Sequence, residues 1–193
     1  EEIGFEIRFI RVTDDFRLDL SNLDELLRGA ALISLTGMSN VLGTINPIKD
    51  IAARAHQLGV LVAVDGAQSV AHSVTDVQDL DIDFLAFGSH KMMGPTGIGA
   101  LWVRREILDT MPAFMGGGGM IADVSLEGFT PAPDVSRFEA GTPPIAEAVG
   151  FKTAVHYLTS LGMDNVARHE EALTAEALEM FATRFGDRIR IIG

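Results

Sequence analysis

The chain has 193 residues, with 15 Lys and Arg against 27 Asp and Glu, and its formal net charge is −12. Such an acidic chain is a poor candidate for binding nucleic-acid phosphates or an anionic membrane surface. It contains no cysteine, which excludes disulfide scaffolds, thiolate zinc sites and a cysteine nucleophile among these residues. No apolar run approaches the ~20 residues that span a bilayer. We therefore expect a soluble, cytoplasmic protein with one main core.

Strands alternate with helices over the first half of the chain. Residues 5–12 alternate apolar and charged side chains, which is the period of a half-buried strand. A helix over 19–27 follows, with Asp19 or Ser21 as its cap. The next predicted elements are strand 30–35, helix 47–58, strand 60–64, strand 84–87 and strand 97–103. Apolar runs of this kind, separated by helices, are typical of a mostly parallel sheet with right-handed crossovers.

The second half begins with a stretch of different character. Four consecutive glycines (116–119) and the prolines at 131 and 133 predict an irregular, mobile loop over 115–133. Two helices follow over 146–161 and 166–185, the second capped by Asp164, and a strand begins at 189–192. The whole pattern predicts an α/β fold of three layers, a mostly parallel sheet flanked by helices.

Polar side chains gather where the predicted parallel strands end. Ligands of open α/β sheets bind beyond the carboxyl ends of the strands. The polar residues at those ends are Asn40, Asp65, Gln68, Ser89, His90 and Lys91. Asp65 also fits a simple Asp-Gly turn, and most lysines are solvated surface charges. However, Lys91 lies between an apolar strand and a Gly-Pro-Thr-Gly turn, a setting in which a lysine can form Schiff bases.

The remaining histidines and the glycine run have simpler interpretations. His56 and His169 fall on predicted helices and are expected at the surface, and His72 and His156 are expected to be structural. No histidines and carboxylates are spaced as metal ligands, so we predict no metal site. The four glycines lack the strand before them and the Gly-Lys-Ser/Thr after them that a phosphate loop requires. An active-site or interface loop is the better interpretation.

Five segments of the chain together resemble the class V aminotransferase group of fold-type I pyridoxal phosphate enzymes. They are Ser39–Pro47, Val64–Gln68, Ser89–Gly99, Gly117–Ile121 and Arg137–Pro143. Within this group the chain is most similar to cysteine desulfurases and selenocysteine lyases. The resemblance runs in the same order over essentially the whole chain. It implies that residues 1–160 are part of the cofactor-binding large domain and that 161–193 begin the small C-terminal domain.

The resemblance assigns a role to each candidate residue. Lys91 corresponds to the lysine that holds pyridoxal 5'-phosphate and moves the α-proton, and Asp65 to the carboxylate that pairs with the ring nitrogen. Gln68 and Asn40 are similar to the amides that reach the phenolic oxygen. His90 and Ser89 are similar to phosphate-binding residues, although relatives often carry the serine where Gly88 stands here. Thr142 resembles the residue that reaches the partner's phosphate across a dimer interface, although Pro144 replaces a common asparagine.

The implied activity is removal of sulfur from L-cysteine, or of selenium from selenocysteine, to give alanine. A homodimer and a sulfur-acceptor protein are implied as partners. Family members are about twice this length, so the chain is expected to be a central fragment that is inactive by itself, without the persulfide cysteine and the substrate arginine. Two alternatives stay open: another class V enzyme of the aminotransferase, kynureninase or epimerase type, and a cofactor-free interaction module.

Overall fold

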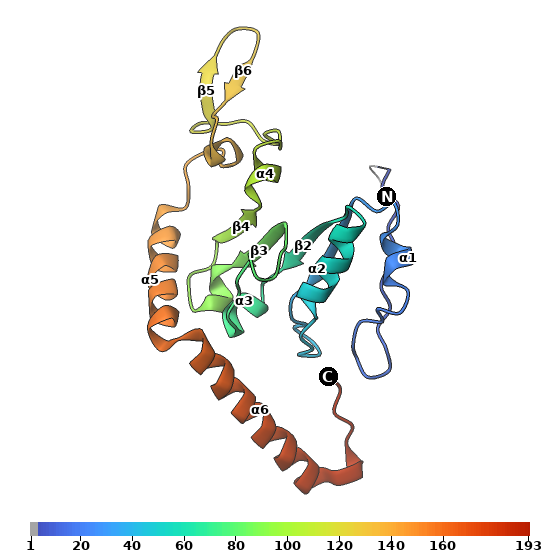
Figure 1. The fold of residues 1–193 in the computed structure, drawn as a ribbon. Coiled ribbons are helices and arrows are strands. Elements are labelled where there is room, and N and C mark those ends of the chain that lie inside the picture. Colours follow the sequence, from blue (N-terminus) through green and yellow to red (C-terminus); the bar gives the residue numbers. More distant parts are fainter. Residues whose placement is uncertain (1–3) are drawn as a thin grey trace.

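The computed structural model describes residues 4–193 and has a four-stranded sheet in the order β1-β2-β3-β4 (Figure 1). Strands β1, β2 and β3 are parallel, and β4 pairs antiparallel with β3, so the prediction of a mostly parallel α/β sheet is confirmed. The sheet strands are β1 (Leu32–Thr36), β2 (Leu61–Asp65), β3 (Phe84–Gly88) and β4 (Gly99–Val103). The helices are α1 (Leu23–Leu27), α2 (Ile48–Gln57), α3 (Ser69–His72), α4 (Arg105–Leu108), α5 (Ile145–Leu161) and α6 (Met163–Phe185). Short 3-10 helices are η1 (Ser89–Met92), η2 (Val135–Phe138) and η3 (Gly186–Arg188).

The core forms where one stripe of α2 meets one face of the sheet. Ile48, Ile51, Ala52 and Ala55 recur at helical spacing and are all at most 6% exposed. They belong to the same buried cluster as Val62, Val64 and Leu85 from the inner face of the sheet. A second, smaller cluster joins η1, α3 and α5, and within it Phe87 and Phe151 meet edge to face at 6.3 Å.

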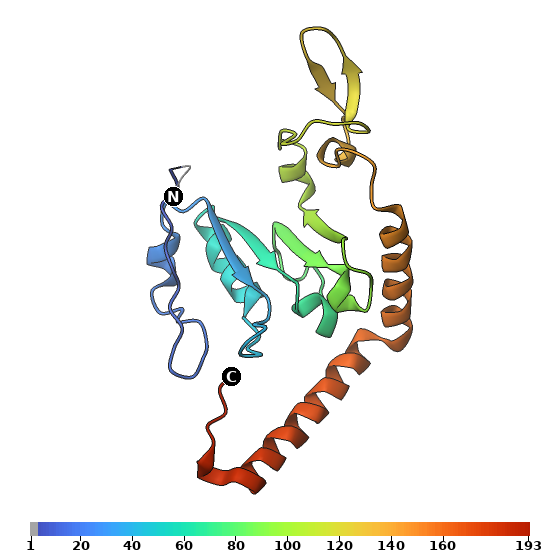
Figure 2. The same cartoon turned by 180° about the vertical axis from the view of Figure 1, so that it is seen from behind.

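The described residues cover only one face of the sheet with helices. Figure 2 shows the strands from behind with no helix in front of them. Ser34, Asp65 and Ala86 point to this open face and are exposed, because side chains alternate along each strand. Both crossovers, β1 to β2 and β2 to β3, step in the same direction along the sheet, and right-handed crossovers then place α2 and α3 on one side. Residues 4–193 thus supply two of the three expected layers.

Two of the predicted strands do not form. Residues 5–12 pair with no strand, and the only ladder contact there is the single bridge between Val12 and Leu18. Phe5, Ile7 and Phe9 are 66%, 54% and 79% exposed. Residues 189–192 are also irregular. Alternation or an apolar run fits a strand, but a strand also needs a neighbour for its backbone hydrogen bonds, and the described chain offers none here.

The stretch 115–133 is more ordered than predicted. It contains the antiparallel hairpin β5 (Ile121–Val124) and β6 (Phe129–Pro131), which projects away from the sheet (Figure 1). The turn is closed by Ser125 N–H, which donates to the carbonyl of Gly128 at 2.8 Å. The expectation of an irregular loop was wrong for these residues because a two-stranded hairpin needs only short local pairing. Both strands are largely exposed, so their sequences lack the pattern of buried apolar residues from which a strand can be predicted.

The helix boundaries differ from the predicted ones by a few residues. Helix α1 begins at Leu23, and the Asp19 carboxylate caps a preceding turn by accepting the Ser21 N–H at 3.0 Å. Helix α6 begins at Met163, directly after Gly162, so Asp164 lies inside its first turn. Within residues 4–193, no helix has both the length and the apolar character needed to cross a bilayer. The expected domain boundary near 160 falls close to the α5–α6 junction and stays a prediction.

An ionic network closes the amino-terminal edge of the sheet. The Asp83 carboxylate is only 4% exposed and accepts from Val62 N–H at 2.8 Å and from Arg104 Nε at 2.9 Å. His56 Nε2 lies 2.8 Å from the same carboxylate, and its Nδ1 lies 3.2 Å from Asp81. Arg104 also donates to Asp81 at 2.7 Å. His56 is therefore half-buried and ties α2 to β3, so its expected surface position was wrong.

We predict that this network makes stability depend on pH. Burial opposes the charged form of His56, but hydrogen bonds to Asp83 and Asp81 outweigh it and raise the pKa of His56 above its ordinary 6.5. A raised pKa means that the stabilisation is complete below the unfolded pKa and is lost as pH rises through the folded pKa. At pH about 6, His56→Gln should lower the free energy of unfolding of the full chain by about 1–3 kcal/mol. Urea unfolding measures this gap.

The difference in the free energy of unfolding between the wild-type chain and His56→Gln should become smaller as the pH is raised to about 9. The matched control is His169→Gln, which alters an exposed histidine and should change stability by less than about 0.5 kcal/mol at either pH. An equal gap for His56→Gln at both pH values would contradict the assignment.

Gly66 holds the turn after β2 close to β3. Its N–H donates to the carbonyl of Ala86 at 2.8 Å. A Cβ at position 66 would lie 2.7 Å from Leu85 Cδ1 and 2.8 Å from Val70 Cγ2, both packed side chains. Only glycine therefore allows the Asp65–Ala67 turn to approach its neighbours this closely.

Gly66→Ala should accordingly lower the free energy of unfolding by about 1–3 kcal/mol, because the added methyl group overpacks a filled region. Gly118→Ala is the control, since nothing lies within 4 Å of a Cβ at that position. Thermal or urea unfolding compares the two variants. Equal stability of both would show that the turn can move away from β3 at no cost.

Candidate functional site

The parallel pairing of β1, β2 and β3 brings three strand ends to one edge. Thr36 is in register with Asp65, and Asp65 is in register with Ala86. The chain leaves β3 two residues later and enters η1, which carries His90 and Lys91. The predicted carboxylate and the predicted lysine thus belong to the ends of adjacent strands.

The Asp65 carboxylate is exposed, and only one of its two oxygens makes a hydrogen bond within residues 4–193. Its Oδ1 accepts the N–H of Ala67 at 2.9 Å, which fixes the side chain over the turn. Oδ2 makes no hydrogen bond to any of residues 4–193. The structure therefore combines the two interpretations of Asp65: it stabilises a turn with one oxygen and presents the other at the strand edge.

Lys91 sits on a short and well-constrained helix. Its backbone lies in η1, which ends where Met93 adopts the left-handed conformation with φ 61° and where Gly94 N–H donates to Ser89 O at 3.0 Å. Helix α5 packs against η1. The side chains of His90 and Lys91 are exposed, and neither is held in an ion pair with residues 4–193. A fixed backbone with a free amine suits a residue that reacts with a ligand.

The Ser89 side chain points into the protein, unlike the exposed side chains of His90 and Lys91. Its side chain is fully buried, and its hydroxyl donates to the carbonyl of Pro95 within the same loop. To contact a phosphate, Ser89 has to exchange that bond. Its proposed phosphate contact stays a prediction.

The two predicted amides occupy different settings. Gln68 follows Asp65 by three residues, is half-buried at the start of α3, and has its Oε1 3.2 Å from His72 Nε2. Asn40 is exposed at the tip of a loop that Ser39 closes through its N–H, which donates to Thr44 O at 2.9 Å. Both lie beyond the carboxyl ends of β1 and β2, on the same edge as Asp65.

Thr142 belongs to a different segment of the chain from the residues at this edge. It is exposed in the segment that leads into α5, next to the run of glycines. Gly141 N–H donates to Gly118 O at 2.8 Å, and a Cβ on Gly117 would lie 3.2 Å from Ala140 Cβ. The glycine run thus packs against the backbone before Thr142. Among residues 4–193, no hydrogen bond connects Thr142 to the Asp65 and Lys91 edge.

Two residues shape this edge without having been assigned to it from the sequence, where His72 was expected only to be structural. Asn46 Nδ2 donates to the carbonyl of Thr36 at 2.8 Å and so fixes the end of β1. His72 bridges Gln68 to Glu170 of α6, at 3.0 Å from the carboxylate. Of these two residues, only Asn46 could have been found from the sequence, because it directly precedes Pro47 at the predicted start of a helix. Nothing in the sequence indicated that Glu170, 98 residues away, meets His72.

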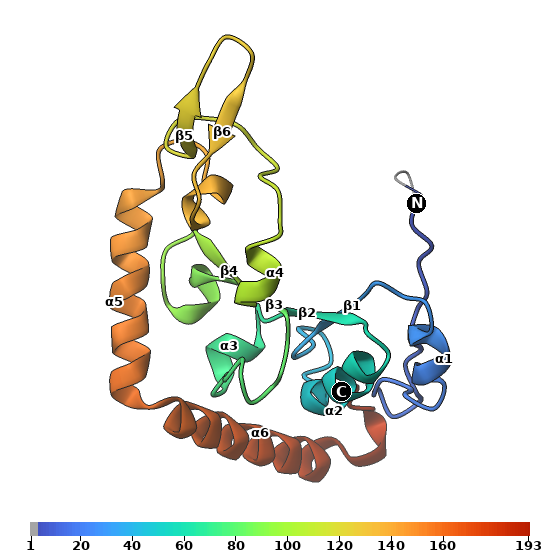
Figure 3. The same cartoon turned by 45° about the horizontal axis from the view of Figure 1, so that its top comes forward.

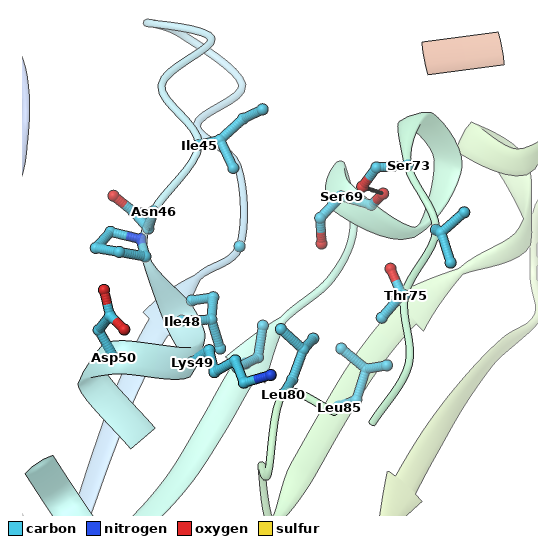
Figure 4. A pocket seen from close by; sticks show the side chains of 14 residues that line it. Ile45, Asn46, Ile48, Lys49, Asp50, Ser69, Ser73, Thr75, Leu80 and Leu85 are labelled. Atoms are coloured by element: carbon cyan, nitrogen blue, oxygen red, sulfur yellow. Dashed lines mark hydrogen bonds between the residues drawn. The ribbon is translucent and has the colours of Figure 1, made fainter. Parts of the chain in front are cut away.

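A pocket of about 260 Å³ lies behind the strand edge, between α2 and α3 (Figure 4). Ile48, Leu80 and Leu85 supply its apolar wall, and Asn46 and Ser69 are polar residues in its lining. Val64 lines this pocket, whereas the next residue, Asp65, points to the opposite face. None of the predicted site residues lines the pocket, so it is separate from the candidate site.

The candidate site shows no sign of a metal centre. Among residues 4–193, no three histidine and acidic side chains are grouped closely enough to hold a metal ion. The functional groups at this sheet edge are instead an amine, a carboxylate, an imidazole and two amides. These groups can bind a polar ligand with a carbonyl and an anionic group.

Comparison with known proteins shows to which family the chain belongs. The family model described as aminotransferase class-V matches residues 1–191. A cysteine desulfurase of Haloferax volcanii is 48% identical over all of this chain and 45% of its own length. A cysteine desulfurase of an Enterobacter species is 48% identical over 95% of this chain and 46% of its own. The apo structure of a cysteine desulfurase from Thermococcus onnurineus aligns with a TM-score of 0.89 and 38% identity, covering 93% of this chain and 45% of that one.

The chain thus spans about half the length of these relatives. The family model, in contrast, matches nearly every residue, and the fold agrees with that of the solved desulfurase. The chain belongs to the class V aminotransferase family, which consists of pyridoxal phosphate-dependent enzymes, and it is a homologue of cysteine desulfurases.

Proposed function

We propose that the protein carrying this chain is a pyridoxal phosphate-dependent cysteine desulfurase or selenocysteine lyase. The observation that carries the proposal is the placement of Asp65 and Lys91 at the ends of adjacent parallel strands. Relatives that are named cysteine desulfurases and share 48% of their aligned residues support the choice within the family. The substrate would be L-cysteine or selenocysteine, the product alanine, and the location the cytoplasm.

The residues present fit the cofactor by their chemistry. Lys91 offers an exposed amine that would attach to the cofactor's carbonyl carbon, and Asp65 offers a free Oδ2 that would pair with the protonated ring nitrogen. When bound, pyridoxal phosphate withdraws electrons from the substrate carbon next to the amino group. Gln68 and Asn40 would donate to the phenolic oxygen. His90 and Ser89 would bind the phosphate, and Thr142 would reach the phosphate of a second copy in a homodimer.

Lys91 would have a second task once the substrate amine replaces its own. Its freed Nζ would accept the proton from the substrate's α-carbon and return a proton later in the reaction. The constrained backbone of η1 keeps that amine near the same position for both tasks.

The sulfur has to leave toward a thiol outside these 193 residues, because the chain contains no cysteine. In the net reaction the Cβ–S bond of cysteine breaks and an S–S bond forms on the acceptor thiol. The acceptor's proton remains in the products, so cysteine and a thiol give alanine and a persulfide without an added oxidant. A sulfur-acceptor protein would then take the sulfur from the persulfide.

We predict that adding pyridoxal phosphate to the full protein produces a visible absorbance band that Lys91→Ala abolishes. The chain has three lysines, Lys49, Lys91 and Lys152, so reduction with borohydride followed by peptide mapping identifies the one that carries the cofactor. Lys152→Ala is the matched control, because it removes another exposed lysine from helix α5 and should leave the band intact. Cofactor label on Lys49 or Lys152 would contradict the assignment.

The rate of alanine formation from L-cysteine tests the reaction itself. Asp65→Asn should reduce this rate by about two orders of magnitude, because an amide stabilises the ring charge poorly. Cofactor binding without alanine formation would favour another class V activity, such as transamination. No binding by the full protein would favour the cofactor-free interaction module.

A further inference from the structure

We propose that Glu170 on α6 is a positioning residue for the cofactor edge and acts through His72 on the amide of Gln68. The inference rests on the proposed function, since it takes Gln68 as a cofactor contact. It goes further because it gives a role to a helix that contributes none of the predicted site residues. Figure 3 shows α6 running beneath α3, which carries His72.

The chain of contacts is continuous from α6 to the strand edge. His72 Nδ1 lies 3.0 Å from both carboxylate oxygens of Glu170. His72 Nε2 lies 3.2 Å from Oε1 of Gln68, one helical turn earlier. Gln68 in turn follows Asp65 by three residues. The side chains of His72 and Glu170 are 33% and 43% exposed, so their contact is partly shielded from water.

The polarity of these groups determines which end of the amide is left for a ligand. A carboxylate and an amide carbonyl oxygen both only accept hydrogen bonds, so in this arrangement both ring nitrogens of His72 carry a proton, and Nδ1–H donates to Glu170. Nε2–H donates to Oε1, so the carbonyl end of the Gln68 amide is occupied. The amide nitrogen makes no hydrogen bond to residues 4–193, and it is the end that can donate to an acceptor.

This orientation matches the proposed cofactor contact. The phenolic oxygen of pyridoxal phosphate is an acceptor, so it needs the donor end of Gln68 and not the carbonyl end. A glutamine amide that rotates freely presents either end, whereas the contact with His72 selects one of them. Glu170 supplies the anchor for His72, because its carboxylate faces the ring with both oxygens.

The test measures cofactor affinity and the absorbance maximum of the bound cofactor in the full protein. Glu170→Ala should weaken cofactor binding about fivefold, the effect of one net hydrogen bond, and shift the absorbance maximum. Glu170→Gln keeps an acceptor for His72 and should lie between Glu170→Ala and the wild type. Glu171→Ala removes the neighbouring, exposed carboxylate of the same helix and should change neither quantity.

A double-mutant cycle separates a positioning role from a general structural one. If Glu170 acts through Gln68, then Glu170→Ala should have no further effect on affinity or absorbance in a Gln68→Ala background. Additive effects, or an unchanged spectrum in Glu170→Ala when Gln68→Ala shifts it, would overturn the inference. Glu170→Gln keeps the test decisive if Glu170→Ala does not fold.

Failure of the proposed function has a different signature. In that case the wild-type protein shows no cofactor band, or mapping places the cofactor on a lysine other than Lys91. The positioning inference fails alone when the wild-type band is present on Lys91 and the Glu170 variants match the wild type.

Discussion

The parallel register between β2 and β3 is the constraint on which the candidate site depends. Because Asp65 is paired with Ala86, the chain turns out of both strands at nearly the same level. Asp65 and the short helix that carries Lys91 therefore lie at the same edge of the sheet, although the two residues are far apart in the chain. Gly66 maintains this arrangement, since its N–H bonds to β3 and its missing side chain permits the close approach.

The two edges of the sheet carry opposite kinds of polar group. At the amino edge, the charges of Asp83, Arg104 and His56 are satisfied by one another and join three elements. At the carboxyl edge, Oδ2 of Asp65, the Lys91 amine and the Gln68 amide nitrogen have no such partners among the described residues. Paired charges stabilise a fold, whereas polar groups left without partners are available to a ligand.

The residues outside the sheet illustrate the limits of local sequence patterns. The 3.6-residue period of α2 and the apolar runs of β1, β2 and β3 were predicted correctly, because each pattern reports a buried face directly. Residues 5–12 carry an equally clear alternation, yet they form no strand in the absence of a neighbour to pair with. The hairpin β5–β6 was missed for the converse reason: its pairing is local and its side chains are exposed.

The sequence by itself determined the α/β class, the order of the strands along the chain and the polar residues at their ends. These features follow from composition and short-range periodicity, which are written in neighbouring residues, and the five motif segments pointed to the family. Only the tertiary structure decided which polar groups are hydrogen-bonded within the chain and which stay free. It turned the Ser89 hydroxyl inward, joined His56 to Asp83 and brought Glu170 to His72. Each of these contacts depends on how the chain folds back on itself, and no local pattern records the distance between residues that meet only in three dimensions.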